Sequence, residues 1–213
     1  MDKKYKQLIK ERPELFKNIS GGIEIITDEQ LISRIEKDLT VDIGIIYQDE
    51  YMMLIKDLVR FSDGSLGPYT RVYHKNRGGV SVFVVCEDKI LLLKHFRHSL
   101  RSWMWETPRG FGEAGQTTEQ NALRELHEEI GVVPMDIVLL GTIFPDAGIV
   151  GERITLYCAR IAPNSTITTE TQEGIERADF FTKDQLKTAI LSGEITDGIT
   201  ISSLVFAELK GLI

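Results

Sequence analysis

Three glutamates near the middle of this 213-residue chain form its clearest chemical pattern. Glu125, Glu128 and Glu129 stand at positions i, i+3 and i+4, so a helix places their carboxylates on one face. Like charges this close repel one another unless a cation lies between them. Clustered carboxylate oxygens are ligands that Mg²⁺ or Mn²⁺ prefers. The spacing therefore indicates either a divalent-metal site or a solvated acidic helix face.

The flanking residues predict how this helix is held. Thr117 and Gln120 form a capping box at its start, and Gly131 is a natural stop after residue 130. The opposite face is apolar and anchors the helix (Ala122, Leu123, Leu126 and Ile130). The preceding loop, residues 108–115, contains three glycines, which let the backbone approach a ligand and turn carbonyls toward a cation.

Loop and helix together resemble the Nudix box, G-x5-E-x7-R-E-U-x-E-E-x-G-U, in which U is aliphatic. Residues 110–132 match every fixed position except one, because Gln116 stands at the position of the first Glu. The resemblance implies that Glu125 and Glu129 are the principal metal ligands. Glu128 would be a further ligand or catalytic group, or would bind through water.

The same resemblance assigns roles to the residues around the glutamates. The backbone carbonyl at Gly110 or a neighbour would complete the metal shell. Arg124 would orient the glutamates through salt bridges. Gln116 would keep a hydrogen bond to Arg124 while lacking the usual charge.

The resemblance extends over residues 50–210, to the ADP-ribose pyrophosphatase branch of the family. Arg97 and the segment Trp105–Gly110 are similar to that branch's Q-Y-R and W-E-x-P-x-G motifs. Residues 193–198 and the following Thr200 look like the usual C-terminal ending of the branch. Glu106 would lie beside the metals or pair with Arg124, and its alternative is a strand-end carboxylate. Arg97 and Arg109 are candidates to pair with substrate phosphates as planar donors, or are ordinary ion pairs.

A polar loop, residues 163–176, aligns with one that often brings a catalytic glutamate to the metals. Glu173 is the first candidate and Glu170 the second, against the alternative of a solvated acidic loop. The branch usually carries P-S-P-G after the box, whereas this chain has Pro-Asp-Ala-Gly at 145–148, without the second proline.

The apolar patterns predict an α/β layered protein. The resemblance implies a Nudix fold, an α/β/α sandwich with a mixed central sheet, here with a small N-terminal helical and strand extension. We expect an N-terminal helical extension over residues 1–45 and a Nudix hydrolase domain over 46–213. Strands are predicted at 43–47, 51–61, 69–74, 80–86, 90–96, 138–144, 154–161 and 178–181. Helices are predicted within 1–40 and at 117–130, 183–192 and 199–209.

The composition of the chain limits the kinds of partner that it can bind. The net charge of −7 argues against binding to a nucleic-acid backbone, and no apolar run approaches the roughly 20 residues of a membrane span. We expect a cytoplasmic enzyme. It would also be a homodimer, with residues 1 to about 75, strands 46–75 among them, supplying much of the interface. The apolar helical faces of the first 40 residues need a partner, and the alternative is that these helices fold back over the sheet of their own subunit. Tyr69 and Arg71 would reach substrate in the partner's site.

The resemblance implies Mg²⁺-dependent hydrolysis, with Mn²⁺ as a possible substitute, of a diphosphate linkage in a small nucleotide substrate. ADP-ribose or a related nucleotide sugar is favoured, releasing a nucleoside monophosphate. Dinucleoside polyphosphates and NADH are alternative substrates. A Nudix-like nucleotide sensor without catalysis is the alternative from another functional class.

Overall fold

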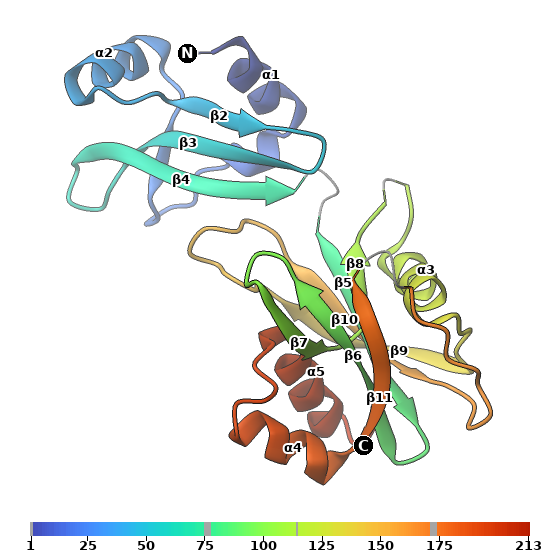
Figure 1. Cartoon of the computed structure of the whole chain (residues 1–213). Coiled ribbons are helices and arrows are strands. Elements are labelled where there is room, and N and C mark those ends of the chain that lie inside the picture. The colour runs from blue at the N-terminus through green and yellow to red at the C-terminus, as the bar shows by residue number, and fades with distance from the viewer. Residues whose placement is uncertain (1, 75–77, 114, 171–173) are drawn as a thin grey trace. The chain divides into compact units, whose positions relative to one another are not determined.

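The computed structural model describes residues 2–74, 78–113, 115–170 and 174–213, and the chain divides into two compact units (Figure 1). The first is Met1–Lys75 with Asp146–Gly151, and the second is Asn76–Pro145 with Glu152–Ile213. The division falls after residue 75 and not at the expected 45/46, because the strands before it pair with one another. No helix within the described ranges is long and apolar enough to cross a membrane.

The first unit is built around one long strand, β3 (Met52–Arg60). β4 (Leu66–His74) pairs with it antiparallel along its whole length. β2 (Gly44–Gln48) and β1 (Glu24–Ile26) share its other side, each pairing with a different end. The helices are α1 (Lys3–Glu11) and α2 (Glu29–Leu39), and Pro13–Phe16 forms one 3₁₀ turn. Strand β1 lies within the stretch that the sequence predicted as helical.

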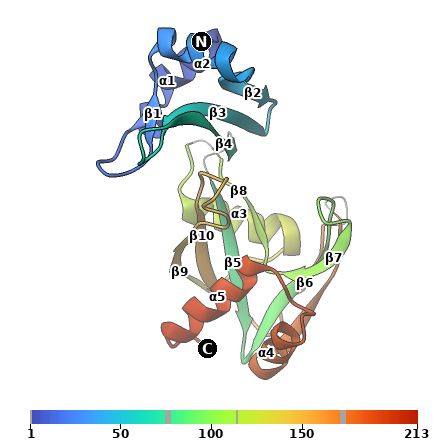
Figure 2. The ribbon, with the colours of Figure 1, turned by 90° about the vertical axis from the view of Figure 1, so that its left-hand side faces the viewer.

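Both helices lie on one side of this sheet, as Figures 1 and 2 show. Tyr5 and Leu8 of α1 pack against strand residues such as Ile55, and Ile32 of α2 packs against Leu58. The apolar helix faces that were expected to need a partner are therefore covered within the unit. The N-cap of α2 is Asp28, whose carboxylate accepts the Leu31 amide proton at 2.7 Å.

The second unit contains a seven-stranded mixed sheet in the order β11-β6-β5-β10-β9, with β7 paired to β6 and β8 to β5. β5 and β10 are parallel, and every other pairing is antiparallel. The strands are β5 (Gly79–Cys86), β6 (Lys89–Arg97), β7 (Ser102–Glu106), β8 (Arg109–Phe111), β9 (Asp136–Ile143), β10 (Ile154–Arg160) and β11 (Ile175–Thr182). The helices are α3 (Thr118–Ile130), α4 (Lys183–Leu191) and α5 (Gly198–Leu209).

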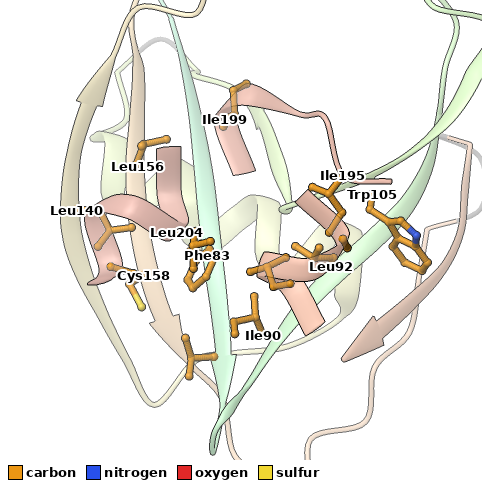
Figure 3. Close-up of a cluster of buried hydrophobic side chains, with 14 residues drawn as sticks. Phe83, Ile90, Leu92, Trp105, Leu140, Leu156, Cys158, Ile195, Ile199 and Leu204 are labelled. Carbon is orange, nitrogen blue, oxygen red and sulfur yellow. The ribbon is translucent and has the colours of Figure 1, made fainter. Parts of the chain in front are cut away.

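Helices cover both faces of this sheet because its central strands β5 and β6 carry unbroken apolar runs, residues 82–86 and 90–93. Val82 and Val84 of β5 pack with Leu126 of α3 on one face. Phe83 and Val85 pack with residues of α4 and α5 on the other, the cluster drawn in Figure 3. Successive side chains of a strand point to opposite faces, so an unbroken apolar run requires cover on both. The predicted α/β/α sandwich is confirmed.

The two central strands separate part of the way along the sheet. β5 and β6 pair only at residues 84–86 and 89–91, next to their connecting turn. Beyond that point β6 pairs with β7, and β5 pairs with β8. Neither β7 nor β8 was predicted from the sequence. Their connection, Thr107–Pro108, joins the two separated strands, and the functional side chains gather around it.

The connection between β9 and β10 belongs to the first unit. Val150 forms a parallel bridge with Val72 of β4, whose amide donates to the Ile149 carbonyl at 2.8 Å. The Gly151 amide in turn donates to the Val72 carbonyl at 3.1 Å. The Pro-Asp-Ala-Gly segment singled out in the sequence thus leads into a stretch held at the edge of β4.

A buried hydrogen bond links α1 to its sheet and gives a stability prediction. The Tyr5 hydroxyl donates to Asp57 at 2.5 Å, and both side chains are almost completely buried. We expect Tyr5→Phe to lower the free energy of unfolding by about 1.5–3 kcal/mol, because the bond goes to a charged acceptor. Urea unfolding followed by circular dichroism measures the loss. Tyr47→Phe, which removes a surface bond to Asp49, is the control; equal effects of the two variants would contradict the assignment.

Candidate active site

The three clustered glutamates of α3, Glu125, Glu128 and Glu129, do not share one environment. Glu129 and Glu125 are buried, with exposed fractions of 2% and 6%, whereas half of the Glu128 side chain is exposed. The Arg109 backbone amide donates to Oε2 of Glu129 at 2.9 Å. Glu125 accepts from Nη2 of Arg124 at 2.6 Å. Two of the three carboxylates therefore face β8, and the third is directed toward solvent and Arg124.

Gly110 is the residue on β8 that makes room for the α3 carboxylates. A Cβ atom at this position would lie 2.1 Å from the carboxylate of Glu125, a distance that no side chain tolerates. The glycine thus serves close approach between strand and helix, whereas the sequence predicted that the glycines of this loop serve approach to a ligand. It places the β8 backbone against the acidic face of α3.

Arg124 holds the acidic helix face together, as the resemblance implied. Its guanidinium contacts Glu125 and Glu128, lies 3.5 Å from Glu113, and donates to the Phe111 carbonyl at 2.9 Å. Partial burial alone would lower the pKa of Arg124, but the surrounding carboxylates raise it, so the cation is retained.

The expected hydrogen bond from Gln116 to Arg124 is replaced by an indirect link. Gln116 donates to Glu113 at 2.7 Å, and it is Glu113 that approaches Arg124. Glu113 was not singled out in the sequence, because nothing in its spacing distinguishes it from other loop acids. Its contacts explain how an uncharged residue is accommodated at position 116.

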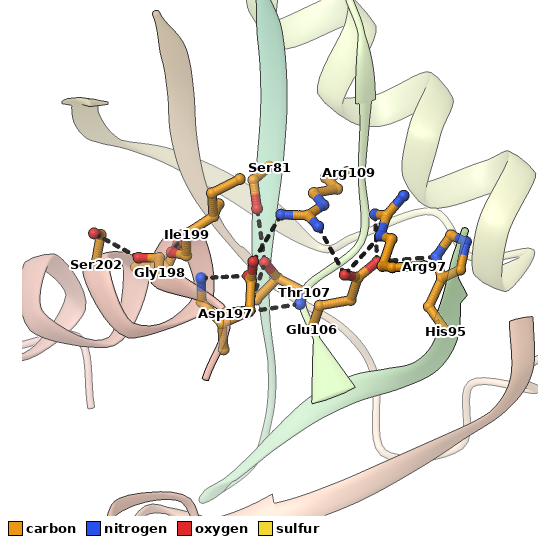
Figure 4. A network of polar contacts seen from close by, with 12 residues as sticks. Ser81, His95, Arg97, Glu106, Thr107, Arg109, Asp197, Gly198, Ile199 and Ser202 are labelled. Atoms are coloured by element: carbon orange, nitrogen blue, oxygen red, sulfur yellow. Dashed lines mark hydrogen bonds and ion pairs between the residues drawn. The ribbon is translucent and has the colours of Figure 1, made fainter. Parts of the chain in front are cut away.

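A buried carboxylate lies at the end of β7. Glu106 is 1% exposed and accepts hydrogen bonds from Arg97 (Nε at 2.9 Å) and Arg109 (Nη2 at 2.7 Å), with His95 Nδ1 at 2.9 Å (Figure 4). Burial alone would raise the pKa of Glu106, but the contact with His95 and the charges of both arginines outweigh it and lower that pKa. Glu106 therefore pairs with Arg97 and Arg109, whereas its expected partner, Arg124, binds the α3 glutamates. His95 was missed, since a lone histidine in an apolar strand carries no pattern.

The N-terminus of α5 joins the same network. Asp197 caps the helix through the Thr200 amide at 2.9 Å, and its other oxygen accepts from Nη1 of Arg109 at 2.9 Å. The Thr200 hydroxyl donates to Asp197 at 2.7 Å and accepts the Thr107 amide proton at 3.0 Å. In the sequence this stretch was recognisable only by its resemblance to the usual ending of the branch. A contact between two residues that are 88 positions apart leaves no local signal.

The polar loop brings one of its two candidate glutamates next to α3. The Glu170 amide lies 3.3 Å from the carbonyl of Glu129, and the Thr168 amide donates to that of Ile130 at 3.0 Å. Glu170 thus lies at the last turn of the acidic helix. Glu173, the first candidate, lies outside the described residues.

Tyr69 and Arg71, the two residues proposed to reach a partner's site, belong to the first unit. Arg71 donates to both oxygens of Asp57 and to the Leu15 carbonyl, and it lies over the ring of Phe16. Its guanidinium therefore has a structural role inside the unit. Tyr69 is 39% exposed, with its hydroxyl 3.5 Å from the Gly148 carbonyl.

The atoms that the acidic face of α3 offers as ligands show whether a metal ion would fit there. Among the described residues no three Asp, Glu, His or Cys side chains already converge, and Glu128 pairs with Arg124. Two buried carboxylates, Glu125 and Glu129, nevertheless face a glycine-containing strand without a sulfur or imidazole donor in the set. Oxygen donors of this kind fit a hard divalent cation that keeps water or phosphate as its remaining ligands.

The α/β/α fold and the acidic helix α3 resemble those of the Nudix family, and a comparison with family profiles agrees with this assignment. The profile of the NUDIX domain family matches residues 75–199, more than half of the chain. The chain belongs to the Nudix family, whose hydrolases generally use divalent metal cations. It is a Nudix pyrophosphohydrolase, and its relatives include an ADP-ribose pyrophosphatase.

Individual relatives agree with this placement. An ADP-ribose pyrophosphatase of Bacillus subtilis (strain 168) is 29% identical over 64% of this chain and 75% of its own length. A methanol dehydrogenase activator of Bacillus methanolicus is 25% identical over 84% of this chain and 97% of its own. A solved structure of an ADP compounds hydrolase shares the fold, with a TM-score of 0.66 at 18% identity over 81% of this chain and 94% of that one.

The buried Glu106 network predicts a pH-dependent loss of stability on substitution. Glu106→Gln leaves Arg97 and Arg109 without their shared anion, which costs about 3–5 kcal/mol at neutral pH. Because the folded-state pKa lies below the ordinary value of 4.5, ionised Glu106 contributes fully above that pH, and its contribution disappears as pH falls through the folded pKa. The difference in the free energy of unfolding between wild type and variant should therefore become smaller below about pH 4.5.

Urea unfolding from pH 7 to pH 3, followed by tryptophan fluorescence, measures this difference. Glu194→Gln is the control, since Glu194 is an exposed carboxylate in the same unit. If this difference in the free energy of unfolding stayed constant across the whole pH range, the assigned charge state of Glu106 would be contradicted.

Proposed function

We propose that this protein is a Mg²⁺-dependent hydrolase of the diphosphate bridge in a nucleoside diphosphate derivative, with ADP-ribose or a related nucleotide sugar as the favoured substrate. One observation carries the proposal: the two buried carboxylates of α3 face strand β8, Glu125 next to Gly110 and Glu129 at the backbone amide of Arg109. Glu125 also accepts a hydrogen bond from the side chain of Arg124. The B. subtilis relative supports the choice of ADP-ribose.

In this proposal Glu125 and Glu129 hold the cation, with Glu128 and the backbone carbonyl at Gly110 as further ligands. A divalent cation bound there supplies neutralisation of phosphate oxygens and a lowered pKa for bound water. Arg124 keeps the carboxylates of neighbouring residues in place through the contacts described above. Burial of both principal ligands excludes competing water, and the lower local dielectric constant strengthens their attraction to a cation.

Arg97 and Arg109 are proposed to bind the diphosphate. The described contacts of each arginine to carboxylates use two of its five N–H donors. The remaining donors suit phosphate oxygens, and pairing with Glu106 fixes the planes of both guanidinium groups. Glu106 thus acts here on the arginines and not on the substrate.

The reaction is attack of water on one phosphorus atom, with cleavage of the bond to the bridging oxygen. A loop carboxylate takes the proton of the attacking water. Glu170 is supported by its place at the last turn of α3, and Glu173 stays a candidate from its sequence position. For ADP-ribose the products are AMP and ribose 5-phosphate.

A substrate panel tests the function: ADP-ribose, other nucleotide sugars, NADH and dinucleoside polyphosphates, each with and without Mg²⁺, with nucleotides separated by chromatography. We expect Mg²⁺-dependent AMP release, greatest with ADP-ribose. Tight nucleotide binding without release of a monophosphate in any mixture would instead support the sensor alternative.

The metal-ligand role of Glu129 gives a second expected outcome. Glu129→Gln should lower kcat by about two orders of magnitude or more, because one charge is lost from the cation site while the side-chain volume is kept. Glu119→Gln, in the exposed first turn of the same helix, is the matched control. Circular dichroism checks that both variants fold, and near wild-type activity of Glu129→Gln at saturating Mg²⁺ would remove Glu129 from the site.

We also propose that the chain is a homodimer that uses the strands of its first unit. Since α1 and α2 cover their own sheet, the exposed apolar residues of and beside β2 are the better-supported surface: Ile46, Tyr47 and Tyr51, with exposed fractions of 40%, 52% and 61%.

Sedimentation of the full chain at micromolar concentration should give a dimer. The pair of changes Ile46→Lys and Tyr47→Lys should give a monomer, because charge is costly in an apolar interface. Leu191→Lys, at an exposed leucine of the second unit, is the control. A monomeric wild type, or a double variant that stays dimeric, would contradict this surface.

A further inference from the structure

The capping residue of α5 does more than a helix cap requires. One carboxylate oxygen of Asp197 accepts the Thr200 amide and hydroxyl protons, at 2.9 and 2.7 Å. The other accepts from Nη1 of Arg109 at 2.9 Å. Capping needs only the first of these contacts. Asp197 is 7% exposed, so its pairing with Arg109 is largely shielded from solvent.

Arg109 transmits this contact to the acidic helix. Its Nη2 donates to Glu106 at 2.7 Å, and its own backbone amide donates to Glu129 at 2.9 Å. The side chain is thus fixed between two carboxylates, while the main chain of the same residue holds a third. Arg109 begins the short strand β8, and this one residue joins the side-chain contacts to Asp197 and Glu106 with the backbone contact to Glu129.

A second connection runs in parallel through neutral groups. The Thr200 hydroxyl accepts the Thr107 amide proton at 3.0 Å, and the Thr107 hydroxyl lies 2.7 Å from that of Ser81 on β5. All three residues are fully buried. The start of α5 therefore fixes both ends of the Thr107–Arg109 segment.

We propose that Asp197 is a positioning residue for the active site: by holding Arg109 it fixes the amide that orients Glu129. The proposal rests on the proposed function for its effect on catalysis, but the structural link can be tested without a substrate. Partners that orient a metal ligand are commonly worth about 10–100-fold in metal affinity or activity.

The decisive variant is Asp197→Asn, because Asn caps helices about as well as Asp but carries no charge for Arg109. Amide hydrogen exchange by NMR is the first readout. The Arg109 amide should exchange at least about tenfold faster in the variant. The Val82 amide, which donates to the Pro108 carbonyl at 2.8 Å, is the internal control and should be unchanged. Unchanged exchange at Arg109 would overturn the proposal.

Kinetics provide the second readout through a double-mutant cycle. Asp197→Asn should lower kcat by about 10–100-fold. Combined with Arg109→Gln it should add little to the loss caused by Arg109→Gln alone, because both changes break one connection. Losses that multiply would mean that Asp197 acts independently of Arg109, and an unchanged kcat in Asp197→Asn would mean that Asp197 is a helix cap only; either result would overturn the proposal.

Asp28→Asn, at the cap of α2, controls for neutralising a capping aspartate and should leave kcat unchanged. Should the wild type cleave no substrate in the panel, the proposed function fails, and hydrogen exchange alone then decides whether Asp197 positions Arg109.

Discussion

The second unit depends on keeping one ionised carboxylate inside the protein. Burying a lone charge is prohibitively costly, so Glu106 requires partners from elements that are distant along the chain. His95 and Arg97 come from β6, and Arg109 comes from β8. These partners can meet around Glu106 only because β5 and β6 separate and leave room for β7 and β8. The opening of the sheet and the buried ion network are therefore two aspects of one arrangement.

The same network links the two sides of the sandwich. Arg109 binds Asp197, which begins a helix on one face, and its amide binds Glu129, whose helix packs on the other. The carboxylates proposed to hold the cation are thus supported from behind by a rigid set of charged hydrogen bonds. Such support favours precise geometry, since each oxygen of Glu106 and Asp197 has a fixed donor.

Local patterns were sufficient to predict α3, with its capping box and terminal glycine, and the apolar strands β5 and β6. Contacts between distant residues were not predictable in this way. Arg109 read equally well as a phosphate ligand or a surface ion pair, and its partner Asp197 lies 88 residues away. β1 and β8 are three residues long, too short for periodicity to register. Glu128 matched its neighbours in spacing yet differs from them in burial, because packing and not sequence decides which side of α3 is covered.

The chain passes between its two units three times, at 75/76, 145/146 and 151/152. The short return segment extends the edge of β4 through Val150, so neither unit is a continuous piece of sequence. A gene fragment that begins at residue 76 would encode Asp146–Gly151 without the strand that satisfies its backbone groups. The N-terminal residues are consequently not a detachable module, and any exchange of this region between related proteins would have to carry both the strand and the returning segment.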